Sequence, residues 1–232
     1  MKKLSDYQGF IFDMDGTLLD SLWIWKQIDI DFLARRGFEL PSDYQKCIGT
    51  MNARDGAAYT IERFGLNEDP EDLMREWFEM AIELYSNTLE LKPWALAFVK
   101  KLKAMGKKTA VATSSDAELA IPALRRTGVL DYLDAVVTTN EVERGKGFPD
   151  VYVEAAARIG TGIPDSVVFE DIIEGITGAA SGGFATVAVY DKLALSTVKE
   201  MRENSDLHIM SFRDALNILE EESNDGKKER LR

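Results

Sequence analysis

The amino-acid sequence predicts an α/β protein whose parallel sheet is interrupted, after its first strand, by an inserted all-helical domain. Three observations lead to this fold class. The run GFIF at residues 9–12 is too short for a helix and rich in β-favouring residues, which indicates a buried strand. No convincing strand follows between residues 22 and 88. From residue 92 onward, short apolar runs alternate with helical patterns, as is typical of a parallel sheet with helices on both faces.

Residues 21–88 are expected to form the inserted domain, which we call the cap. Apolar residues recur there at helical spacing in about four segments. The first segment ends at Gly37, the second restarts at Pro41, the third is closed by Gly65, and the fourth begins with an acidic turn at Asp69. Glycine is favoured just after a helix, and acidic residues complement the helix dipole at its start. The cap is therefore predicted to be all-helical.

The remaining residues, 1–20 and 89–222, are expected to form a three-layer, Rossmann-like core. Its further strands are predicted at 109–113, 135–139, 167–170 and 186–190. The last predicted helix runs from Phe212 to Glu220. The polar residues 223–232, SNDGKKERLR, are expected to be a disordered tail.

The charge balance and the cysteine content restrict the partners and the compartment. The chain has 232 residues and a formal net charge of −12, which argues against nucleic acid or an anionic membrane surface as a partner. Its single cysteine, Cys47, cannot form an internal disulfide and suits a reducing compartment. No apolar run is long enough for a signal-peptide core or a membrane-spanning helix. We expect a cytoplasmic monomer that acts on a small molecule.

Two carboxylates, Asp13 and Asp15, follow the first predicted strand. Residues i and i+2 of a strand point to the same side, so the two acids would gather at one strand end and repel one another. Mg²⁺ would remove this conflict, because it prefers oxygen ligands. A surface turn is the alternative, since Asp and Gly are turn residues. A helix–loop–helix calcium site is excluded, because its glycine would come five residues after the first Asp, whereas Gly16 comes three after.

Polar residues also follow three later strands, at the place where ligands collect in open α/β sheets. The second strand ends in TSSD, so Thr113 and Ser114 offer hydroxyl groups beside a helix N-terminus, which suits either a phosphate oxygen or an ordinary helix cap. Lys146 lies between two glycines in a loop. It would either bind phosphate as a cation or be an ordinary solvated side chain. Glu170 and Asp171 end the fourth strand, where two buried carboxylates would need compensation.

These motifs resemble those of the haloacid dehalogenase (HAD) superfamily of aspartate-nucleophile phosphohydrolases. FDMDGTLLDS at 12–21 resembles its first motif, DxDGT with a trailing DS. Thr113 matches the second motif, GKGFPDVY around Lys146 the third, and EDIIEG at 170–175 the fourth. Gly147 stands where the third motif usually has proline, and Ile172 where the fourth usually has serine. The resemblance covers the whole chain except the tail, although the cap matches only in type.

The resemblance implies a two-step phosphoryl transfer with a covalent aspartyl-phosphate. Asp13 would be the nucleophile and Asp15 the general acid/base, while Thr113 and Lys146 would hold phosphate oxygens. The implied Mg²⁺ ligands are Asp13, Asp15 through its backbone carbonyl, and Asp171, with Glu170 close by. Gly16 and Ser114 are expected to lie at the substrate.

The cap is expected to select the substrate, and it leaves alternatives open. A mutase-type cap usually has a histidine five residues after the Asp of the DS pair, and Trp25 occupies that place. Trp25 would pack within the cap or stack on a substrate, and Arg54 would meet a distal anion or lie in solvent. We expect a phosphatase for a small phosphomonoester such as a sugar phosphate. The alternatives are a β-phosphoglucomutase-like phosphomutase and, from another class, a non-enzymatic phospho-acceptor of the receiver type.

Overall fold

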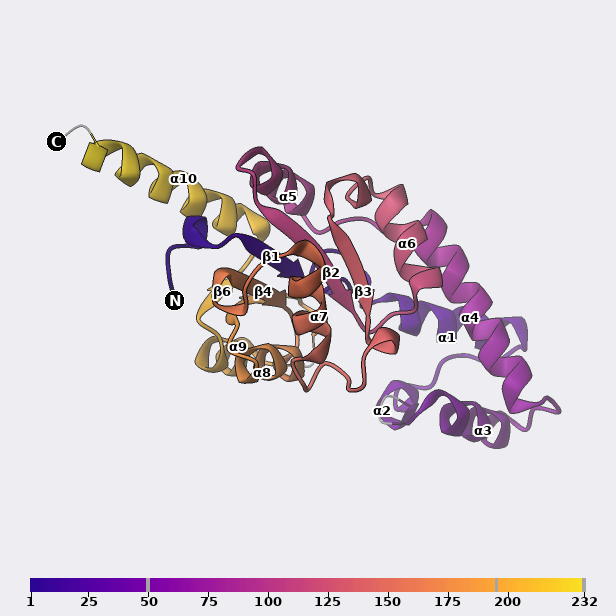
Figure 1. Ribbon diagram of the computed structural model, residues 1–232. Coiled ribbons are helices and arrows are strands. Elements are labelled where there is room, and N and C mark those ends of the chain that lie inside the picture. Colours follow the sequence, from indigo (N-terminus) through magenta and orange to yellow (C-terminus); the bar gives the residue numbers. More distant parts are fainter. Residues whose placement is uncertain (49–50, 195, 231–232) are drawn as a thin grey trace. The chain divides into compact units, whose positions relative to one another are not determined.

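The computed structural model describes residues 1–48, 51–194 and 196–230, and it divides into two units. One unit contains Met1–Leu22 and the chain from Leu89 onward, and the other spans Trp23–Thr88. We describe the first as the core and the second as the cap (Figure 1).

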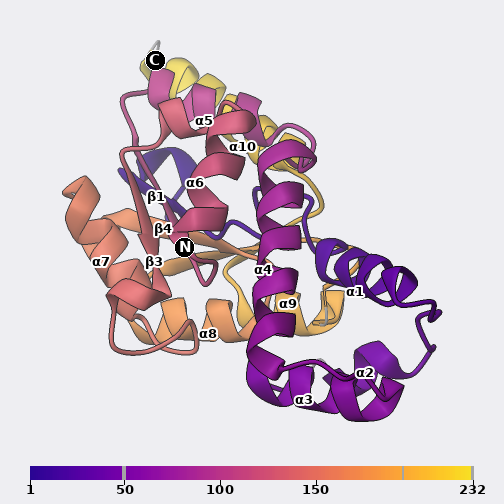
Figure 2. The same ribbon diagram turned by 90° about the vertical axis from the view of Figure 1, so that its right-hand side faces the viewer.

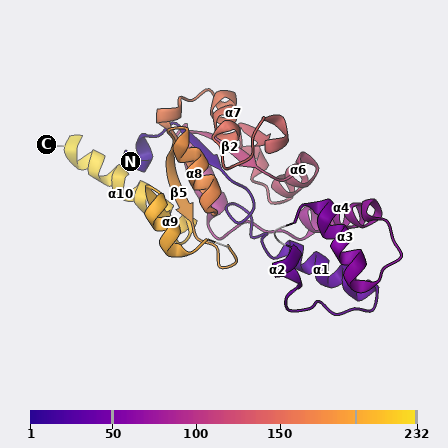
Figure 3. The same cartoon turned by 90° about the horizontal axis from the view of Figure 1, so that it is seen from below.

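The core is built around six parallel strands in the order β3-β2-β1-β4-β5-β6 (Figures 1 and 3). The strands are β1 (Gly9–Phe12), β2 (Lys108–Thr113), β3 (Ala135–Thr138), β4 (Ser166–Glu170), β5 (Ala185–Val189) and β6 (Leu207–Ile209). The core helices are α5 (Ala95–Ala104), α6 (Ala117–Arg126), α7 (Asp150–Ile159), α8 (Ile173–Ser181), α9 (Val198–Asn204) and α10 (Phe212–Arg230). Short 3₁₀ turns are η1 (Leu4–Asp6), η2 (Leu130–Tyr132), η3 (Thr139–Glu141) and η4 (Ile163–Asp165). The predicted α/β fold class is confirmed.

The two faces of the sheet carry different kinds of core, because side chains alternate along each strand. Phe10 and Phe12 of β1 point to the face covered by α5 and α10 and join an aromatic cluster there. Its members, with ring centroids 4.9–6.3 Å apart, are Phe10, Phe12, Phe98, Phe169 and Phe212. Ile11 points to the opposite face and packs with smaller residues of β2, β4 and α7. The short apolar run at 9–12 therefore serves both faces, as a central buried strand must.

The cap consists of α1 (Ile24–Arg35), α2 (Tyr44–Ile48), α3 (Ala53–Phe64) and α4 (Pro70–Asn87) (Figure 2). Its helix ends follow the predicted signals. Gly65 adopts the left-handed conformation (φ +63°) that closes α3, and the Asp69 side chain accepts a hydrogen bond from the Glu71 N–H at the start of α4. Phe32 of α1 packs edge-on against Trp77 of α4, with ring centroids 5.5 Å apart.

The C-terminal helix differs from the prediction. We expected it to end at Glu220 and residues 223–232 to be disordered, whereas α10 continues to Arg230. Beyond the predicted end, the Glu222 carboxylate accepts the backbone N–H groups of Leu4 and Ser5 at 2.8 and 2.7 Å. This contact joins α10 to the first turn of the chain. The single glycine of the tail does not end the helix, because one glycine inside a helix costs only about 1 kcal/mol. Across the described residues, we find no helix that combines the length and apolarity needed to cross a membrane.

Candidate active site

The carboxyl ends of β1, β2 and β4, with the loop after β3, bring the predicted site residues of the core together. Asp13 follows β1 directly, Thr113 ends β2, and Glu170 ends β4. Because parallel strands end at the same edge of a sheet, these side chains meet although they lie far apart in the sequence.

Lys146 is the cation at the centre of this edge. It is 8% exposed, and its ammonium group donates to Asp13 Oδ1 and, at 2.6 Å, to Glu170 Oε1. Although burial opposes it, the two carboxylates raise the pKa of Lys146, so the side chain remains charged. The structure therefore excludes the alternative of a solvated loop lysine.

The carboxylate of Glu170 is fully engaged by protein groups. Its Oε1 accepts from Lys146 and from the hydroxyl of Tyr152 at 2.8 Å, and its Oε2 accepts the Asp171 N–H at 3.2 Å. Glu170 is fully buried. These contacts make it suited to orienting Lys146.

Asp171 has a buried carboxylate oxygen that lacks a hydrogen-bond partner among the described residues. Its Oδ1 accepts a hydrogen bond of 3.4 Å from Thr17, whereas Oδ2 is buried and finds no hydrogen-bond donor among the described residues. Burial, together with the carboxylates of Asp13 and Glu170, raises the pKa of Asp171 to about 9. Leaving a buried oxygen unpaired is costly, so a bound cation or an ordered water at this oxygen would stabilise the site.

A divalent cation fits this requirement. Asp13, Glu170 and Asp171 each offer an oxygen within 4.8 Å of the others, and all three are buried. Burial and the neighbouring Glu170 raise the pKa of Asp13 to about 6, against the opposing effect of Lys146. Mg²⁺ takes oxygen ligands at close range and would stabilise the ionised carboxylates. The donor set therefore suits Mg²⁺.

Two glycines make room for these contacts. Gly16 has φ +80°, and a Cβ on it would lie 2.1 Å from Asp171 Oδ2. Gly178 in α8 lets the Lys146 loop approach the helix, because a Cβ there would lie 2.0 Å from the Lys146 carbonyl oxygen. A side chain at either position would displace the group that it faces.

Asp15 lies beyond the end of β1, which stops at Phe12. The Asp15 carboxylate accepts hydrogen bonds of 2.7 Å from the hydroxyls of Ser21 and Ser115. Two donors from separate segments fix the orientation of this carboxylate.

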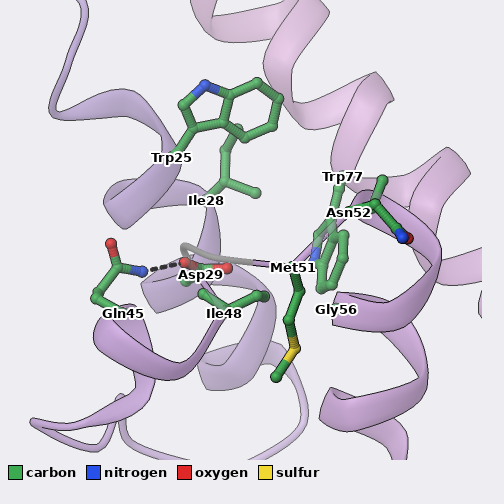
Figure 4. A pocket seen from close by; sticks show the side chains of 10 residues that line it. Trp25, Ile28, Asp29, Gln45, Ile48, Met51, Asn52, Gly56 and Trp77 are labelled. Atoms are coloured by element: carbon green, nitrogen blue, oxygen red, sulfur yellow. Dashed lines mark hydrogen bonds between the residues drawn. The ribbon is translucent and has the colours of Figure 1, made fainter.

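The remaining predicted residues lie in two places. In the core, the buried Thr113 hydroxyl oxygen accepts the Ser115 N–H at 3.0 Å, while Ser114 is exposed. In the cap, Arg54 pairs with Glu71, and Trp25 lines a pocket within the helices (Figure 4).

Three residues of the site were not predicted, namely Ser21, Ser115 and Tyr152. Each lies inside a motif that the sequence analysis used, in the trailing DS, in TSSD and in FPDVY respectively. Their hydrogen-bond partners are up to 100 residues away in the sequence, so only the fold identifies them.

The chain resembles known proteins in sequence and in structure. Residues 10–189 match the family model described as haloacid dehalogenase-like hydrolase. Fructose-1-phosphate phosphatase YqaB of Escherichia coli (strain K12) is 31% identical, covering 79% of this chain and 96% of its own. The phosphorylated carbohydrates phosphatase of Thermotoga maritima is 26% identical, covering 92% of this chain and 99% of its own.

Two further matches differ in kind. The protein SUPPRESSOR OF QUENCHING 1, chloroplastic, of Arabidopsis thaliana is 30% identical over 82% of this chain, which spans only 18% of that protein's length. A solved Thermotoga maritima structure, described as a candidate β-phosphoglucomutase, superposes with a TM-score of 0.83 at 25% identity. It covers 92% of this chain and 99% of that one.

Proposed function

Because the chain belongs to the haloacid dehalogenase-like hydrolase family, we propose that it is a Mg²⁺-dependent phosphatase acting through Asp13 on a small phosphomonoester. One observation carries the proposal. Among the residues that the structure describes, the buried oxygen Asp171 Oδ2 has no hydrogen-bond partner, although it lies beside Asp13 at the edge of the sheet where ligands bind. The phosphatase names of the relatives agree with this assignment.

The metal would be held by Asp13, Asp171 and the backbone carbonyl of Asp15. Bound there, Mg²⁺ would neutralise charge on the transferring phosphoryl group. Glu170 would keep Lys146 in place, because both of its oxygens are already occupied by protein donors.

In the first chemical step, a carboxylate oxygen of Asp13 attacks phosphorus in line. The bond from phosphorus to the leaving oxygen breaks, and that oxygen receives a proton from Asp15. In the second step, Asp15 takes a proton from water, the water oxygen attacks phosphorus, and Asp13 is released with inorganic phosphate. Ser21 and Ser115 hold Asp15 in one orientation for both transfers.

The phosphate oxygens would be held by Lys146, by the Thr113 hydroxyl and by backbone near Gly16 and Ser114. Lys146 is the fixed positive charge of this set, and it supplies local attraction in a chain of net charge −12. Screening over about 8 Å at physiological salt limits the repulsion by the remaining charges. We further propose a cytoplasmic monomer, in keeping with the single cysteine.

A phosphomutase is the second candidate, because the solved structure with the TM-score of 0.83 is described as a candidate β-phosphoglucomutase. Trp25 stands where the mutase pattern has a histidine, and an indole cannot shuttle a proton, which favours the phosphatase. Incubation with β-glucose 1-phosphate and a trace of glucose 1,6-bisphosphate separates the two. Faster accumulation of glucose 6-phosphate than of free phosphate would establish the mutase.

The phosphatase proposal is tested with p-nitrophenyl phosphate in Mg²⁺, in Ca²⁺ and in chelator. Hydrolysis should require Mg²⁺, and Ca²⁺ should inhibit, because its larger and more flexible coordination shell misplaces the attack. Asp13→Asn should be inactive, whereas Asp131→Asn, at an exposed aspartate of η2, should keep wild-type turnover. Equal rates in chelator and in Mg²⁺ would remove the metal assignment.

A further inference from the structure

The four helices of the cap enclose a pocket of about 460 Å³ (Figure 4). This volume lies in the range of about 300–1,000 Å³ that is usual for small-molecule sites. Its lining comes from all four helices and consists of Trp25, Ile28, Asp29, Gln45, Ile48, Met51, Asn52, Ala53, Gly56 and Trp77. Most of these side chains are apolar, so the few polar atoms decide what the pocket can bind.

Asp29 provides a buried acceptor in this pocket. It is 8% exposed, and its Oδ2 accepts a hydrogen bond from the Gln45 amide, a neutral partner. The other oxygen, Oδ1, receives no hydrogen bond from any residue that the structure describes. Burial raises the pKa of Asp29 to about 6, against the opposing hydrogen bond from Gln45, so the carboxylate is ionised at neutral pH.

Trp77 provides a buried donor. It is 9% exposed, and its indole Nε1–H has no acceptor among the described residues. Figure 4 shows Trp77 and Asp29 on opposite walls of the pocket. The remaining polar side chain, Asn52, uses both ends of its amide to bind Asp55 at the start of α3.

A hydroxyl group satisfies both of these atoms, because it donates and accepts hydrogen bonds. An ammonium group could donate to Asp29 but could not accept from Trp77. A carboxylate or phosphate could accept from Trp77 but would bring a negative charge beside Asp29. Asp29 is the only charged residue among those that line the pocket, and Arg54, the cation expected for a distal anion, pairs with Glu71 elsewhere.

We propose that the cap pocket binds uncharged polyhydroxylated molecules, with Asp29 and Trp77 as the polar contacts, and that it rejects molecules carrying a second anionic group. The indole faces of Trp25 and Trp77 would pack on the carbon skeleton of the ligand. The identity of the ligand as the alcohol of a phosphomonoester rests on the proposed phosphatase function, whereas the binding itself does not.

The test measures binding directly on the full chain. The four tryptophans give four indole N–H signals in an ¹⁵N-correlated NMR spectrum, and Trp77→Phe assigns the signal of Trp77. The probes are glycerol, xylitol and D-glucitol, with D-gluconate as the six-carbon acid, at about pH 8, where Asp29 is ionised. We expect D-glucitol or a shorter polyol to shift the Trp77 signal, and gluconate to bind at least about tenfold more weakly than glucitol.

Matched variants show whether the named atoms cause the selectivity. Asp29→Asn keeps the shape and removes the charge, so the preference for glucitol over gluconate should fall to within about twofold. Asp31→Asn removes a charge from the same helix outside the pocket lining and should keep the wild-type preference. Trp77→Phe keeps an aromatic ring without the donor, and its affinity for glucitol, measured by titration calorimetry, should be at least about fivefold weaker.

Three outcomes would overturn the inference: no polyol shifts the Trp77 signal, gluconate binds as tightly as glucitol, or Asp29→Asn leaves the preference unchanged. The phosphatase proposal can be overturned independently of the pocket assignment. If polyols bind at Trp77 but no phosphomonoester is hydrolysed, the pocket assignment stands and the phosphatase proposal falls. If aryl phosphate is hydrolysed and no polyol binds, the reverse holds.

Discussion

The Ser196 hydroxyl oxygen accepts a hydrogen bond of 3.1 Å from the backbone N–H of Ile173, in the first turn of α8. Ile172 is the N-cap residue of that helix and has no side-chain acceptor. Ser196, from the segment after β5, thus replaces the serine that the fourth motif usually supplies next to its acidic pair. Because α8 starts two residues after Asp171, this contact supports the position of the loop that carries Asp171.

Ser196→Ala should lower the free energy of unfolding by about 1 kcal/mol, the usual cost of losing a helix N-cap. Introducing Ile172→Ser into that variant should restore part of the loss, because an N-cap serine accepts the N–H of the second or third residue of the helix. The check is a double-mutant cycle by urea denaturation. Additive effects of the two substitutions would show that Ser196 does not act as the substitute cap.

Trp94 adopts a left-handed backbone conformation, with φ +72°, at the N-cap of α5. This conformation costs an L-residue about 1–2 kcal/mol and glycine almost nothing. The Trp94 ring lies 4.5 Å from the Arg213 guanidinium. Replacing Trp94 by glycine or by alanine would remove this contact in both cases. Trp94→Gly should therefore be about 1 kcal/mol more stable than Trp94→Ala. A glycine variant no more stable than the alanine variant in thermal denaturation would contradict the argument.

Asp29 should make the stability of the protein depend on pH in a defined direction. Its pKa is raised to about 6 from about 3.9 in the unfolded chain, so folding favours the protonated form. The stability that this group contributes is complete below about pH 4 and is lost as the pH rises through about 6. Asp29→Asn removes the titration, so its stability relative to the wild type should rise between pH 4 and pH 8.

The measurement is the difference in unfolding free energy between Asp29→Asn and wild type at each pH. Other acids, including Asp13 and Asp171, titrate in both proteins and cancel in the difference. Asp31→Asn, at another aspartate of α1, is measured in parallel as the matched control. A constant difference for Asp29→Asn would show that this carboxyl is not perturbed by burial.

Lys146→Ala should lower turnover on the order of 100-fold or more, the usual result of losing an electrostatic contact to the transition state. Lys146→Arg should recover little, because the planar guanidinium does not fit the space between Asp13 and Glu170. Lys107→Ala is the matched control: this lysine is also buried, but it donates to the Ser5 carbonyl. The measurement is steady-state hydrolysis of an aryl phosphate. Equal losses of turnover in the two alanine variants would contradict a catalytic role for Lys146.

Much of the core could be predicted because its signals are local. The apolar run before Asp13 and the acids after β4 indicate strand ends by themselves, and strand ends meet in a parallel sheet. The Ser196 contact could not be predicted, since it depends on how the segment after β5 folds back. Nor could the extension of α10, because Glu222 is recognisable as an anchor only when η1 is seen beside it.

In the cap, too, contacts between residues that are distant in the sequence could not be predicted. Its helices follow from apolar spacing, but the environment of Asp29 does not, because an acid on α1 looks solvated in the sequence. Its burial depends on α2 and α4 packing around it, and Gln45 and Trp77 come from those helices. Sequence reasoning therefore selected Trp25 and Arg54 in the cap and passed over Asp29 and Trp77.

The central claim is that Asp13 accepts the phosphoryl group and that Asp15 activates the water that removes it. p-Nitrophenolate is a good leaving group and needs little protonation, so Asp15→Asn should still permit the first step while blocking the second. Mixing this variant with p-nitrophenyl phosphate and Mg²⁺ should release a burst of about one nitrophenolate per enzyme molecule and then stop. Mass spectrometry after acid quenching should find one added phosphoryl group on the peptide that contains Asp13. Steady turnover without a burst, or a phosphoryl group on any other residue, would contradict the account.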